Sequence, residues 1–367
     1  MAKMEKYGGM KMSGKHTDKE PKERKEKKKG KGLKIFGIIV LILVILLVLI
    51  VGSIFVFINS KLSKIQQVNI DEADLGVSSQ VEENLSGYRN IALFGIDSRD
   101  SSLGKGNRSD CIIIASINND TKEVKLISVY RDTYVNIEGY GLDKITHAYS
   151  YGEAPLALKT LNENFDLNIT EFATVNFDAV AEAINALGGV TIDVQPEEVQ
   201  YINSYINETS KVTGLSTEKV TSSGTQTLDG VQAVAYSRIR YTEGGDYKRA
   251  ERMRTVVEAM VEKFKTKNIS EMNQIIDQIL PEVYTNITSG DIFSLLPSVA
   301  SFKVTDSIGW PYETKGITLD RWYGVPVTLE SNVTRLHEEA FGETDYTPSD
   351  RVKEISNEII QKTGYTE

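Results

Sequence analysis

Four arginines stand where a cation is costly. Arg238 and Arg240 flank Ile239, so in an extended segment both side chains lie on one face. Arg249 and Arg252 begin a predicted long helix, where the dipole disfavours cations by about 0.3–1 kcal/mol. They also continue its apolar stripe, which comprises Met253, Val256, Val257, Met260 and Phe264. Because a helix N-terminus also binds anions, the four arginines together predict a phosphate site. The alternative is ion pairing with Glu243, Asp246 and Glu251.

A second set of charged residues stands at the ends of predicted strands and in the loop between the first two: Asp97, Arg99, Arg108, Asp110, Arg131 and Asp132. If the strands bearing Asp97 and Asp110 are neighbours, these two carboxylates converge at one sheet end. Two hard oxygen donors beside phosphate-binding arginines suit Mg²⁺, which takes one or two protein carboxylates plus phosphate oxygens and waters. The alternative is that each Asp is a turn residue or cap. For Lys144, spacing does not decide between a phosphate contact and a solvated charge.

Several kinds of site are excluded. The chain has no G-x-S-x-G, no H-E-x-x-H and no G-x-G-x-x-G after a strand. Its one cysteine, Cys111, lies in an apolar strand and is expected to be core, and it rules out an internal disulfide or a Cys-based zinc site. Among the 367 residues the net charge is −9, but residues 1–34 contain 13 Lys/Arg and 5 Asp/Glu. The remainder is therefore strongly acidic, which argues against nucleic-acid binding by the folded part.

Four regions follow one another along the chain. Residues 1–34 are basic and of low complexity, and are predicted to be a disordered cytoplasmic tail that contacts anionic membrane lipid. Residues 35–58 carry no charge and are long enough to span a hydrocarbon core of about 30 Å. A cleaved signal peptide is the alternative, but the apolar run is too long and no A-x-A-like site follows it. Residues 59–88 are interpreted as an extracellular stalk and 89–367 as one extracellular domain, since the positive charge precedes the span.

The elements that must position the charged residues form an α/β pattern. Strands are expected over 90–96, 111–117, 123–130, 190–194 and 326–329. Turn residues Asn118-Asn119-Asp120 predict a hairpin between the second and third of these. Helices are expected over 155–165, 177–187, 228–237 (entered through Asp229) and 247–265. The fold class predicted is a three-layer α/β/α sandwich with a mixed central sheet, preceded by one N-terminal transmembrane helix.

The sequence resembles the LytR-CpsA-Psr family over roughly residues 88–267, and more loosely to about residue 361. The resemblance rests on many motifs in order: Asn90 to Arg99 (NIALFGIDSR), Arg108-Ser109-Asp110, Ser128 to Thr133 (SVYRDT), Asp143-Lys144-Ile145 with Ala148-Tyr149, Gly188-Gly189-Val190, Leu228-Asp229-Gly230 and Tyr236 to Arg240 (YSRIR). The family also has a short cytoplasmic tail, one span and an external domain.

The resemblance implies a phosphotransferase. A glycopolymer, such as teichoic acid or capsule, would move from polyprenyl pyrophosphate to peptidoglycan, with the lipid tail in an apolar channel. By motif position, Asp97 and Asp110 would hold Mg²⁺, or Mn²⁺ in its place. Pyrophosphate would be bound by Arg131, Lys144, Arg238, Arg240 and Arg249, with Arg108 at the reacting phosphates and Arg99 and Arg252 as less specific matches. Either Asp97 or Asp132 would accept the proton of the acceptor hydroxyl. The inward faces of 177–187 and 256–264 are expected to wall the lipid channel or to be plain core.

This sequence departs from the family pattern at two positions. Met253 stands where the family often has glutamine, so a polar contact to the headgroup is either lost or supplied by another residue. Tyr130 stands where proline is common, which changes local stiffness more than chemistry. Two other functions remain open. One is a protein that binds or hydrolyses the polyprenyl lipid without transfer, and the other is a membrane-bound transcriptional regulator, which the predicted topology argues against.

Overall fold

The computed structural model describes residues 66–96 and 103–366, which belong to the compact unit Phe57–Glu367. The expected tail, the span over 35–58, and the site residues Asp97 and Arg99 lie outside the described residues. Within 66–96 and 103–366, no helix has the length and apolar character that crossing a bilayer requires.

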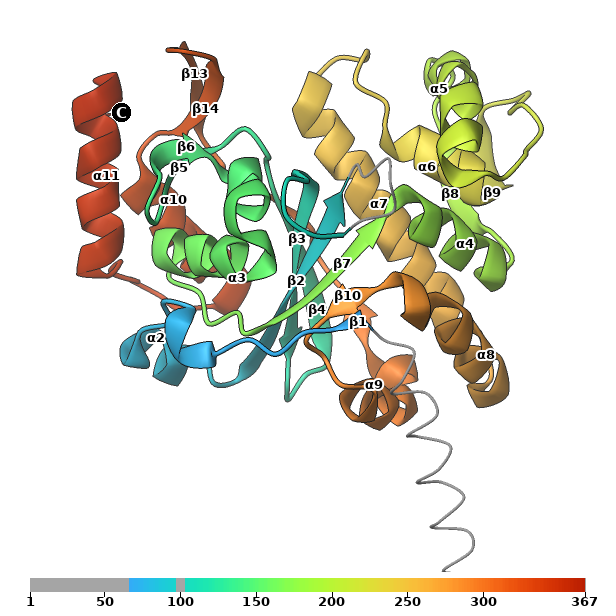
Figure 1. Cartoon of the computed structure of the whole chain (residues 1–367), viewed down its shortest axis with the longest axis horizontal. Coiled ribbons are helices and arrows are strands. Elements are labelled where there is room, and N and C mark those ends of the chain that lie inside the picture. Colours follow the sequence, from blue (N-terminus) through green and yellow to red (C-terminus); the bar gives the residue numbers. More distant parts are fainter. Residues whose placement is uncertain (1–65, 97–102, 367) are drawn as a thin grey trace, which may run out of the picture. The chain divides into compact units, whose positions relative to one another are not determined.

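A mixed sheet forms the centre of this unit, as expected (Figure 1). Its strands are β1 (Gln66–Gln67), β10 (Tyr284–Thr285), β7 (Glu171–Asn176), β2 (Tyr88–Ile96), β3 (Ser109–Asn118), β4 (Glu123–Val129) and β11 (Lys303–Val304), in that spatial order, with β12 (Ile308–Trp310) also on β4. β7 is parallel to β2, whereas β2, β3 and β4 are antiparallel in sequence order. The predicted hairpin is therefore confirmed.

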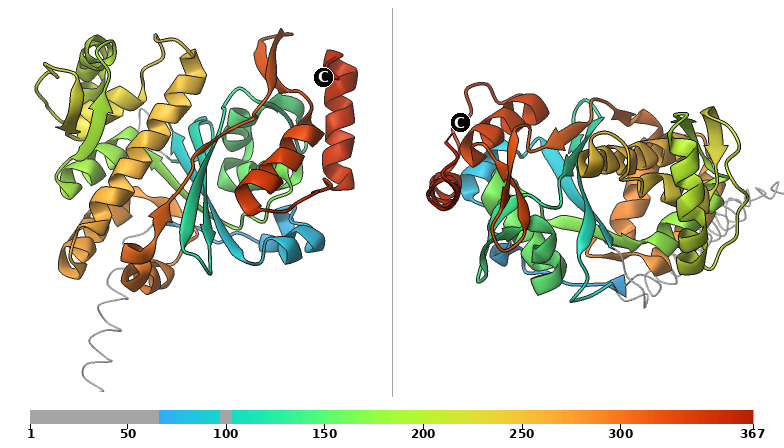
Figure 2. Two further views of the ribbon diagram at one scale, coloured as in Figure 1. Left: turned by 180° about the vertical axis from the view of Figure 1, so that it is seen from behind. Right: turned by 90° about the horizontal axis from the view of Figure 1, so that it is seen from above.

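Helices cover both faces of the sheet, which the view from above in Figure 2 shows. Alternate residues of β2 and β3 point to opposite faces because side chains alternate along a strand. Phe94 and Ile112 pack in the larger core with α3 (Ile145–Phe165), α10 (Leu329–Leu336) and α11 (Asp350–Thr363). Leu93 and Ile113 face the opposite way, toward Val257 of α7 (Gly245–Lys265).

A smaller layer packs beside α7. It contains α4 (Phe177–Leu187), α5 (Glu198–Thr213) and α6 (Gly230–Ser237), with a two-stranded sheet of β8 (Val190–Val194) and β9 (Gly224–Leu228). Asp229 is the N-cap of α6, which confirms that the helix is entered there, and Gln232 closes a capping box with it. Gly188 ends α4 in the left-handed conformation that glycine adopts at low cost.

The remaining elements complete the unit. They are η1 (Glu72–Asp74), α2 (Ser79–Asn84), β5 (Tyr134–Ile137), β6 (Gly141–Lys144), α8 (Ile269–Ile279), η2 (Leu280–Glu282), α9 (Ser289–Leu295), η3 (Leu296–Ser301), β13 (Thr314–Thr318), β14 (Trp322–Pro326) and η4 (His337–Phe341). β5 pairs with β6, and β13 pairs with β14, each as a separate antiparallel ribbon.

Three expectations differ from the structure. The described part of the predicted stalk, residues 66–88, is folded: Leu75, Val81 and Leu85 are buried in the larger core, so the domain begins before residue 89. The strand expected over 326–329 is wrong, because β14 ends at Pro326 and Leu329 begins α10, capped by Thr328. Arg238 to Arg240 are not a strand, since Arg238 is the C-cap of α6.

Candidate functional site

Asp110 occupies an irregularity in the central sheet. Gly95 of β2 pairs with Cys111 and Ile96 pairs with Ser109, so Asp110 is the extra residue of a bulge. A bulge turns a side chain out of the regular alternation, and bulges are common next to active sites. Asp97 and Asp110 are expected to converge if their strands are neighbours. β2, the strand that precedes Asp97, does pair with β3, which carries Asp110.

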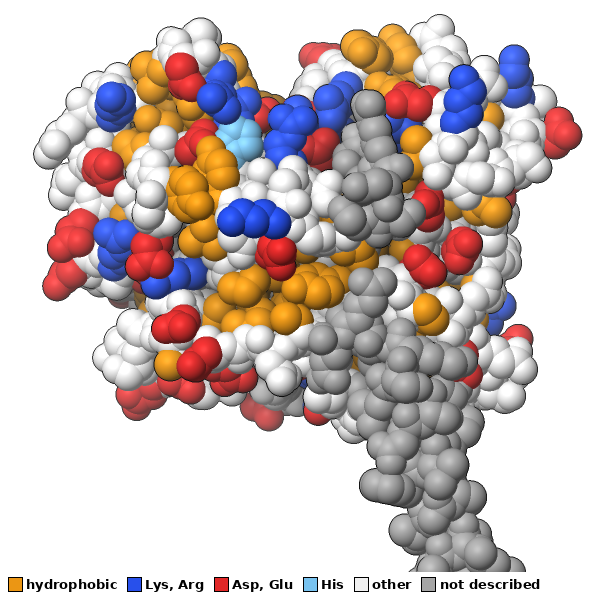
Figure 3. Space-filling view, viewed as in Figure 1, with side chains coloured by type: hydrophobic (Ala, Val, Ile, Leu, Met, Phe, Trp, Pro, Cys, Tyr) orange, Lys and Arg blue, Asp and Glu red, His pale blue; other side chains and the backbone are white. Residues whose placement is uncertain are grey.

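Three arginines from separate segments converge on Asp110. Nη1 of Arg131 lies 2.9 Å from Oδ1 of Asp110. Nη2 of Arg240 lies 3.5 Å from Oδ2, and Nη2 of Arg249 donates to the Asp110 carbonyl at 2.9 Å. Figure 3 shows Lys/Arg and Asp/Glu side chains gathered around a hollow at the upper edge of this face.

Asp246 is a second carboxylate shared by the same three arginines. Its Oδ2 lies 3.4 Å from Nε of Arg131, and its Oδ1 lies 3.7 Å from Nε of Arg240 and 3.3 Å from Nη1 of Arg249. Asp246 is in the first turn of α7, so it offsets the unfavourable placement of Arg249 at that helix end. The ion-pairing alternative is thus realised for Asp246.

Burial and charge act against each other in this cluster. Burial opposes the charge of Arg131, but Asp110, Asp246 and Asp132 outweigh it and raise the pKa of the guanidinium. Burial raises the pKa of Asp246, against the opposing effect of Arg131 and Arg240. Nε of Arg249 is buried and has no hydrogen-bond acceptor, whereas the buried Nε of Arg131 has only the longer ion-pair contacts to Asp246 and Asp132. A buried donor without an acceptor suits a site completed by an anionic ligand.

Asp132 and Lys144 form a pair beside Arg131. Nζ of Lys144 lies 2.6 Å from Oδ1 of Asp132, and Nε of Arg131 lies 3.7 Å from Oδ2. Lys144 is the N-cap residue of α3, and backbone N–H groups of that helix start bond to the 131–133 turn: Ile145 donates to Thr133, and Thr146 donates to Arg131. The turn and the helix therefore hold Asp132 and Lys144 in place.

A polar pocket of about 150 Å³ opens beside the cluster. Its lining is Asp110, Phe177, Tyr205, Arg238, Arg240, Arg249 and Met253. Arg238 lies over the ring of Phe177 at 5.1 Å and pairs with Glu208 at 3.0 Å. Arg240 is the most exposed of these arginines, with a side chain 42% exposed. The pocket thus offers several guanidinium groups to an anion.

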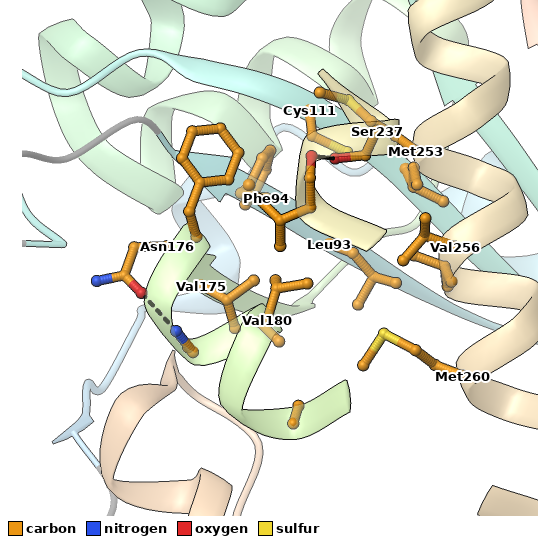
Figure 4. A pocket seen from close by; sticks show the side chains of 18 of the residues that line it. Leu93, Phe94, Cys111, Val175, Asn176, Val180, Ser237, Met253, Val256 and Met260 are labelled. Atoms are coloured by element: carbon orange, nitrogen blue, oxygen red, sulfur yellow. Dashed lines mark hydrogen bonds between the residues drawn. The ribbon is translucent and has the colours of Figure 1, made fainter. Parts of the chain in front are cut away.

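An apolar cavity of about 310 Å³ adjoins the polar pocket, because Phe177 and Met253 line both. Figure 4 shows Val180 of α4 and Val256 and Met260 of α7 around it, with Leu93 of β2 as part of the wall. The two helix faces expected to wall a channel are therefore brought together. Burial raises the pKa of the Cys111 thiol, also in this wall, to about 12, so Cys111 is not an activated nucleophile.

Two other predicted arginines form no ion pair with Asp110 or Asp246. Arg252 is buried away from the polar pocket: its Nε lies 2.7 Å from Oε1 of Glu198, and its Nη1 donates to the Ile239 carbonyl. It positions the segment between Arg238 and Arg240, which corrects its assignment to pyrophosphate. Arg108 is exposed, and its side chain forms no ion pair with a described residue.

Sequence reasoning missed the central place of Asp246, which it weighed only as a structural counter-charge. The signal was its spacing: Asp246 precedes Arg249 by three residues, and residues at that spacing meet on a helix. Asp110, Arg131, Lys144, Arg238, Arg240 and Arg249 all lie at or beside the cluster as predicted.

The donor set also fits a divalent cation with phosphate present. Among residues 66–96 and 103–366, no group of three or more His, Cys, Asp or Glu side chains is arranged to hold a metal by itself. Asp110 offers two hard oxygens next to guanidinium groups that attract phosphate. Mg²⁺ commonly takes such a limited set and completes it with phosphate oxygens and water.

The chain has clear relatives. The sequence model of the LytR_cpsA_psr family matches residues 53–323. TagT of Bacillus subtilis (strain 168), a polyisoprenyl-teichoic acid–peptidoglycan teichoic acid transferase, is 34% identical over 233 residues, which are 62% of this chain and 70% of TagT.

Two solved structures are similar in fold and sequence. TagT bound to LIIa-WTA has a TM-score of 0.53 at 26% identity, covering 77% of this chain and 92% of that one. TagT with bound octaprenyl pyrophosphate lipid has a TM-score of 0.50 at 25% identity, with the same coverage of 77% and 92%.

Proposed function

This chain belongs to the LytR-CpsA-Psr family and is a transferase, and we propose that it moves an anionic glycopolymer from a polyprenyl-pyrophosphate carrier to peptidoglycan. The polymer is a teichoic acid, a capsular polysaccharide or a similar chain. One observation supports this most strongly: the apolar cavity and the arginine-lined pocket share Phe177 and Met253 as a common wall. A lipid pyrophosphate needs an apolar slot continuous with a cationic pocket.

The donor is proposed to lie across both cavities. Its isoprenoid chain occupies the apolar cavity, where burial contributes about 0.8 kcal/mol per CH₂ group. Its pyrophosphate binds Arg238, Arg240 and Arg249 and displaces Asp110 and Asp246 from part of their guanidinium contacts. Because Met253 stands between the two cavities where the family often has glutamine, its side chain offers the headgroup no hydrogen bond there.

The reaction is a phosphoryl transfer. The acceptor hydroxyl oxygen forms a bond to the phosphorus that bears the glycopolymer, and the bond from that phosphorus to the bridging oxygen breaks. Polyprenyl monophosphate leaves with the bonding electrons, and the hydroxyl proton passes to a carboxylate. Asp132 is the described candidate for that base, and Asp97 is the other. Catalysis then consists of positioning and charge neutralisation, for which Arg131 is central.

Mg²⁺, or Mn²⁺ in its place, is proposed to be held by Asp110 together with Asp97. When bound, it would neutralise charge on the phosphate oxygens. Residues 35–58 are proposed to anchor the domain outside the plasma membrane, with the N-terminus in the cytoplasm. Protease treatment of intact protoplasts tests that topology, since a cytoplasmic catalytic domain would be protected.

The test is a transfer assay with the full-length chain in detergent. The protein is mixed with a labelled polyprenyl-pyrophosphate glycan, peptidoglycan fragments and Mg²⁺. Parallel reactions contain EDTA, Arg131→Ala or Arg240→Ala. Label on peptidoglycan that is lost in all three parallel reactions is the expected result.

Two other outcomes have distinct meanings. Free lipid phosphate and unattached glycan phosphate, with no label on peptidoglycan, would identify a hydrolase. Retained lipid without turnover, across several donor glycans, would identify a binding protein and contradict the transferase assignment.

A further inference from the structure

A third cavity, of about 260 Å³, lies next to the charged cluster. Its lining is Tyr130, Asp132, Thr133, Gly244, Gly245, Asp246, Tyr247, Thr314, Trp322 and Gly324. We call it the aromatic cleft. Asp132 and Asp246 belong both to its wall and to the charged cluster, so a ligand in the aromatic cleft reaches the same carboxylates that face Arg131.

Trp322 is held with its indole accessible. The side chain lies over two glycines that pair across the β13–β14 ribbon, Gly316 and Gly324. A Cβ atom at Gly316 would lie 2.8 Å from the indole Nε1, and one at Gly324 would lie 3.5 Å from its Cη2. The ring is therefore seated against backbone on one side, yet the residue is 45% exposed. Trp322 presents a flat apolar face that no described residue covers fully.

The second aromatic wall is fixed as well. Tyr247 packs edge to face on Tyr130, with ring centroids 4.5 Å apart. Its hydroxyl lies 2.8 Å from Oγ1 of Thr314, which ties α7 to the β13–β14 ribbon. The ribbon is also tied to the candidate base, because the backbone N–H of Gly324 donates to the carbonyl of Asp132 at 2.9 Å. The aromatic walls thus keep a fixed relation to Asp132.

The charges of the two open cavities differ in sign. The polar pocket contains three arginines and one carboxylate, which suits a pyrophosphate. The lining of the aromatic cleft contains two carboxylates and no Lys or Arg. The aromatic cleft therefore lacks the guanidinium groups that would bind a polyanion, whereas an uncharged pyranose can place its C–H face on an indole and its hydroxyls near carboxylates. Rigid aromatic side chains supply such contact area at low entropic cost.

We propose that the aromatic cleft binds a sugar unit of the acceptor glycan, stacked on Trp322, and presents its hydroxyl to Asp132. This inference rests on the proposed transfer to peptidoglycan and identifies which cavity receives the acceptor. The donor and the acceptor would then lie on different sides of Arg131. Its Nη1 contacts Asp110, which lines the donor pocket, and its Nε lies near Asp132 and Asp246, which line the aromatic cleft.

Tryptophan fluorescence gives a test that does not depend on turnover. The chain has two tryptophans, Trp310, which is fully buried, and Trp322. The full-length protein is titrated with a soluble peptidoglycan oligosaccharide while acrylamide quenching is measured. Subtracting the signal of Trp322→Phe, which retains only Trp310, isolates the response of Trp322. The oligosaccharide is expected to shield Trp322 from acrylamide and to shift its emission to shorter wavelength.

Transfer kinetics form the second arm. Trp322→Ala is expected to raise KM for the acceptor about tenfold, the scale of a lost stacking contact, and to leave KM for the lipid donor unchanged. Trp322→Phe keeps a ring and should recover most of the affinity. Leu319→Ala is the matched control, since Leu319 is an exposed apolar residue at the tip of the same ribbon and does not line the cleft. Thermal unfolding checks that each variant is folded.

The outcomes separate this inference from the proposed function. Wild-type transfer with an unchanged acceptor KM in Trp322→Ala would overturn the acceptor site and leave the transferase intact. Absence of transfer by the wild type would contradict the proposed function, but shielding of Trp322 by the oligosaccharide would still support the glycan site. If the oligosaccharide does not shield Trp322 at concentrations above the acceptor KM, the glycan site in the aromatic cleft is overturned.

Discussion

Nη1 of Arg131 lies 2.9 Å from Oδ1 of Asp110, and this contact joins two cavities of different chemistry. Asp110 lines the arginine-rich polar pocket, while the Nε side of the same guanidinium faces Asp132 and Asp246 in the aromatic cleft. A planar guanidinium donates in several fixed directions, which a lysine ammonium cannot reproduce. Arg131 therefore links carboxylates that line the two cavities, and under the proposed function it would contact the phosphoryl group during transfer.

Replacing Arg131 is expected to affect the reaction more than the fold. Arg131→Ala should lower transfer by about 10²–10³-fold, the scale seen when one donor to a developing charge is removed. Arg131→Lys should recover only part of the rate. The control is Arg351→Ala, because Arg351 pairs at the surface with Glu163 instead. The measurement is the initial transfer rate at saturating donor. A near-normal rate for Arg131→Ala would show that Arg131 does not take part in the mechanism.

Arg252 is expected to behave as a structural residue. Arg252→Met leaves the buried carboxylate of Glu198 without its cation, which should cost about 3–5 kcal/mol of the free energy of unfolding. The double variant Arg252→Met with Glu198→Leu should recover much of that loss. Urea denaturation measures both. A stable single variant that has lost pyrophosphate binding would instead restore the assignment made from sequence.

Filling the apolar cavity should block the lipid. Val180 lines it, and Val180→Phe is expected to weaken binding of a polyprenyl pyrophosphate at least tenfold, because the added ring occupies the space of the chain. Binding of inorganic pyrophosphate, which needs only the polar pocket, should not change. Val180→Ala is the matched control, since it enlarges the same cavity and should keep lipid binding. Equal lipid affinity in both variants would place the lipid elsewhere.

The seat of Trp322 offers a second probe of the aromatic cleft. Gly316→Ala introduces a Cβ atom 2.8 Å from the indole Nε1, so the ring must move. The acceptor KM is expected to rise several-fold without removal of any aromatic group. Gly87→Ala is the control, since nothing lies within 4 Å of a Cβ atom there. If Gly316→Ala and Gly87→Ala have the same KM for the acceptor, the orientation of the Trp322 indole has no role in acceptor binding.

Asp143 predicts a pH dependence of stability. Burial acts to raise its pKa, but hydrogen bonds from Tyr151, His147 and the backbone of Lys144 outweigh this and lower the pKa below its ordinary value of 3.8. The folded state therefore favours the carboxylate, and the resulting stability is present above pH 3.8 and is lost as the pH falls through the lower folded-state pKa.

Asp143→Asn is accordingly expected to lose about 1–3 kcal/mol of unfolding free energy at pH 7, with a gap to the wild type that narrows below pH 3.8. Denaturant unfolding at pH 7, 5 and about 3 measures this. Asp120→Asn, in an exposed turn, is the control and should follow the wild type at every pH. A gap that stays constant with pH would show that Asp143 acts through its shape and not its charge.

The sequence by itself determined the mixed α/β sheet, the β3–β4 hairpin, the full extent of α4 and the capped start of α6. These follow from local signals: apolar strand composition, turn residues, helical periodicity and an aspartate at the helix start. It also singled out Arg131, Lys144, Arg238, Arg240 and Arg249 through their types, their placement and the family motifs. Such signals are contained in a few neighbouring residues, so they can be read without the fold.

Only the tertiary structure decided how the charges are shared. Arg249 and Arg252 start the same helix and look alike in sequence, but Arg249 reaches Asp110 of β3 while Arg252 is buried against Glu198 of α5. Asp246 became central because three segments bring arginines to it. The aromatic cleft is assembled from β13, β14, the start of α7 and the 130–133 turn, which are distant in sequence. Contacts between distant segments depend on packing of the whole domain, so no local pattern specifies them.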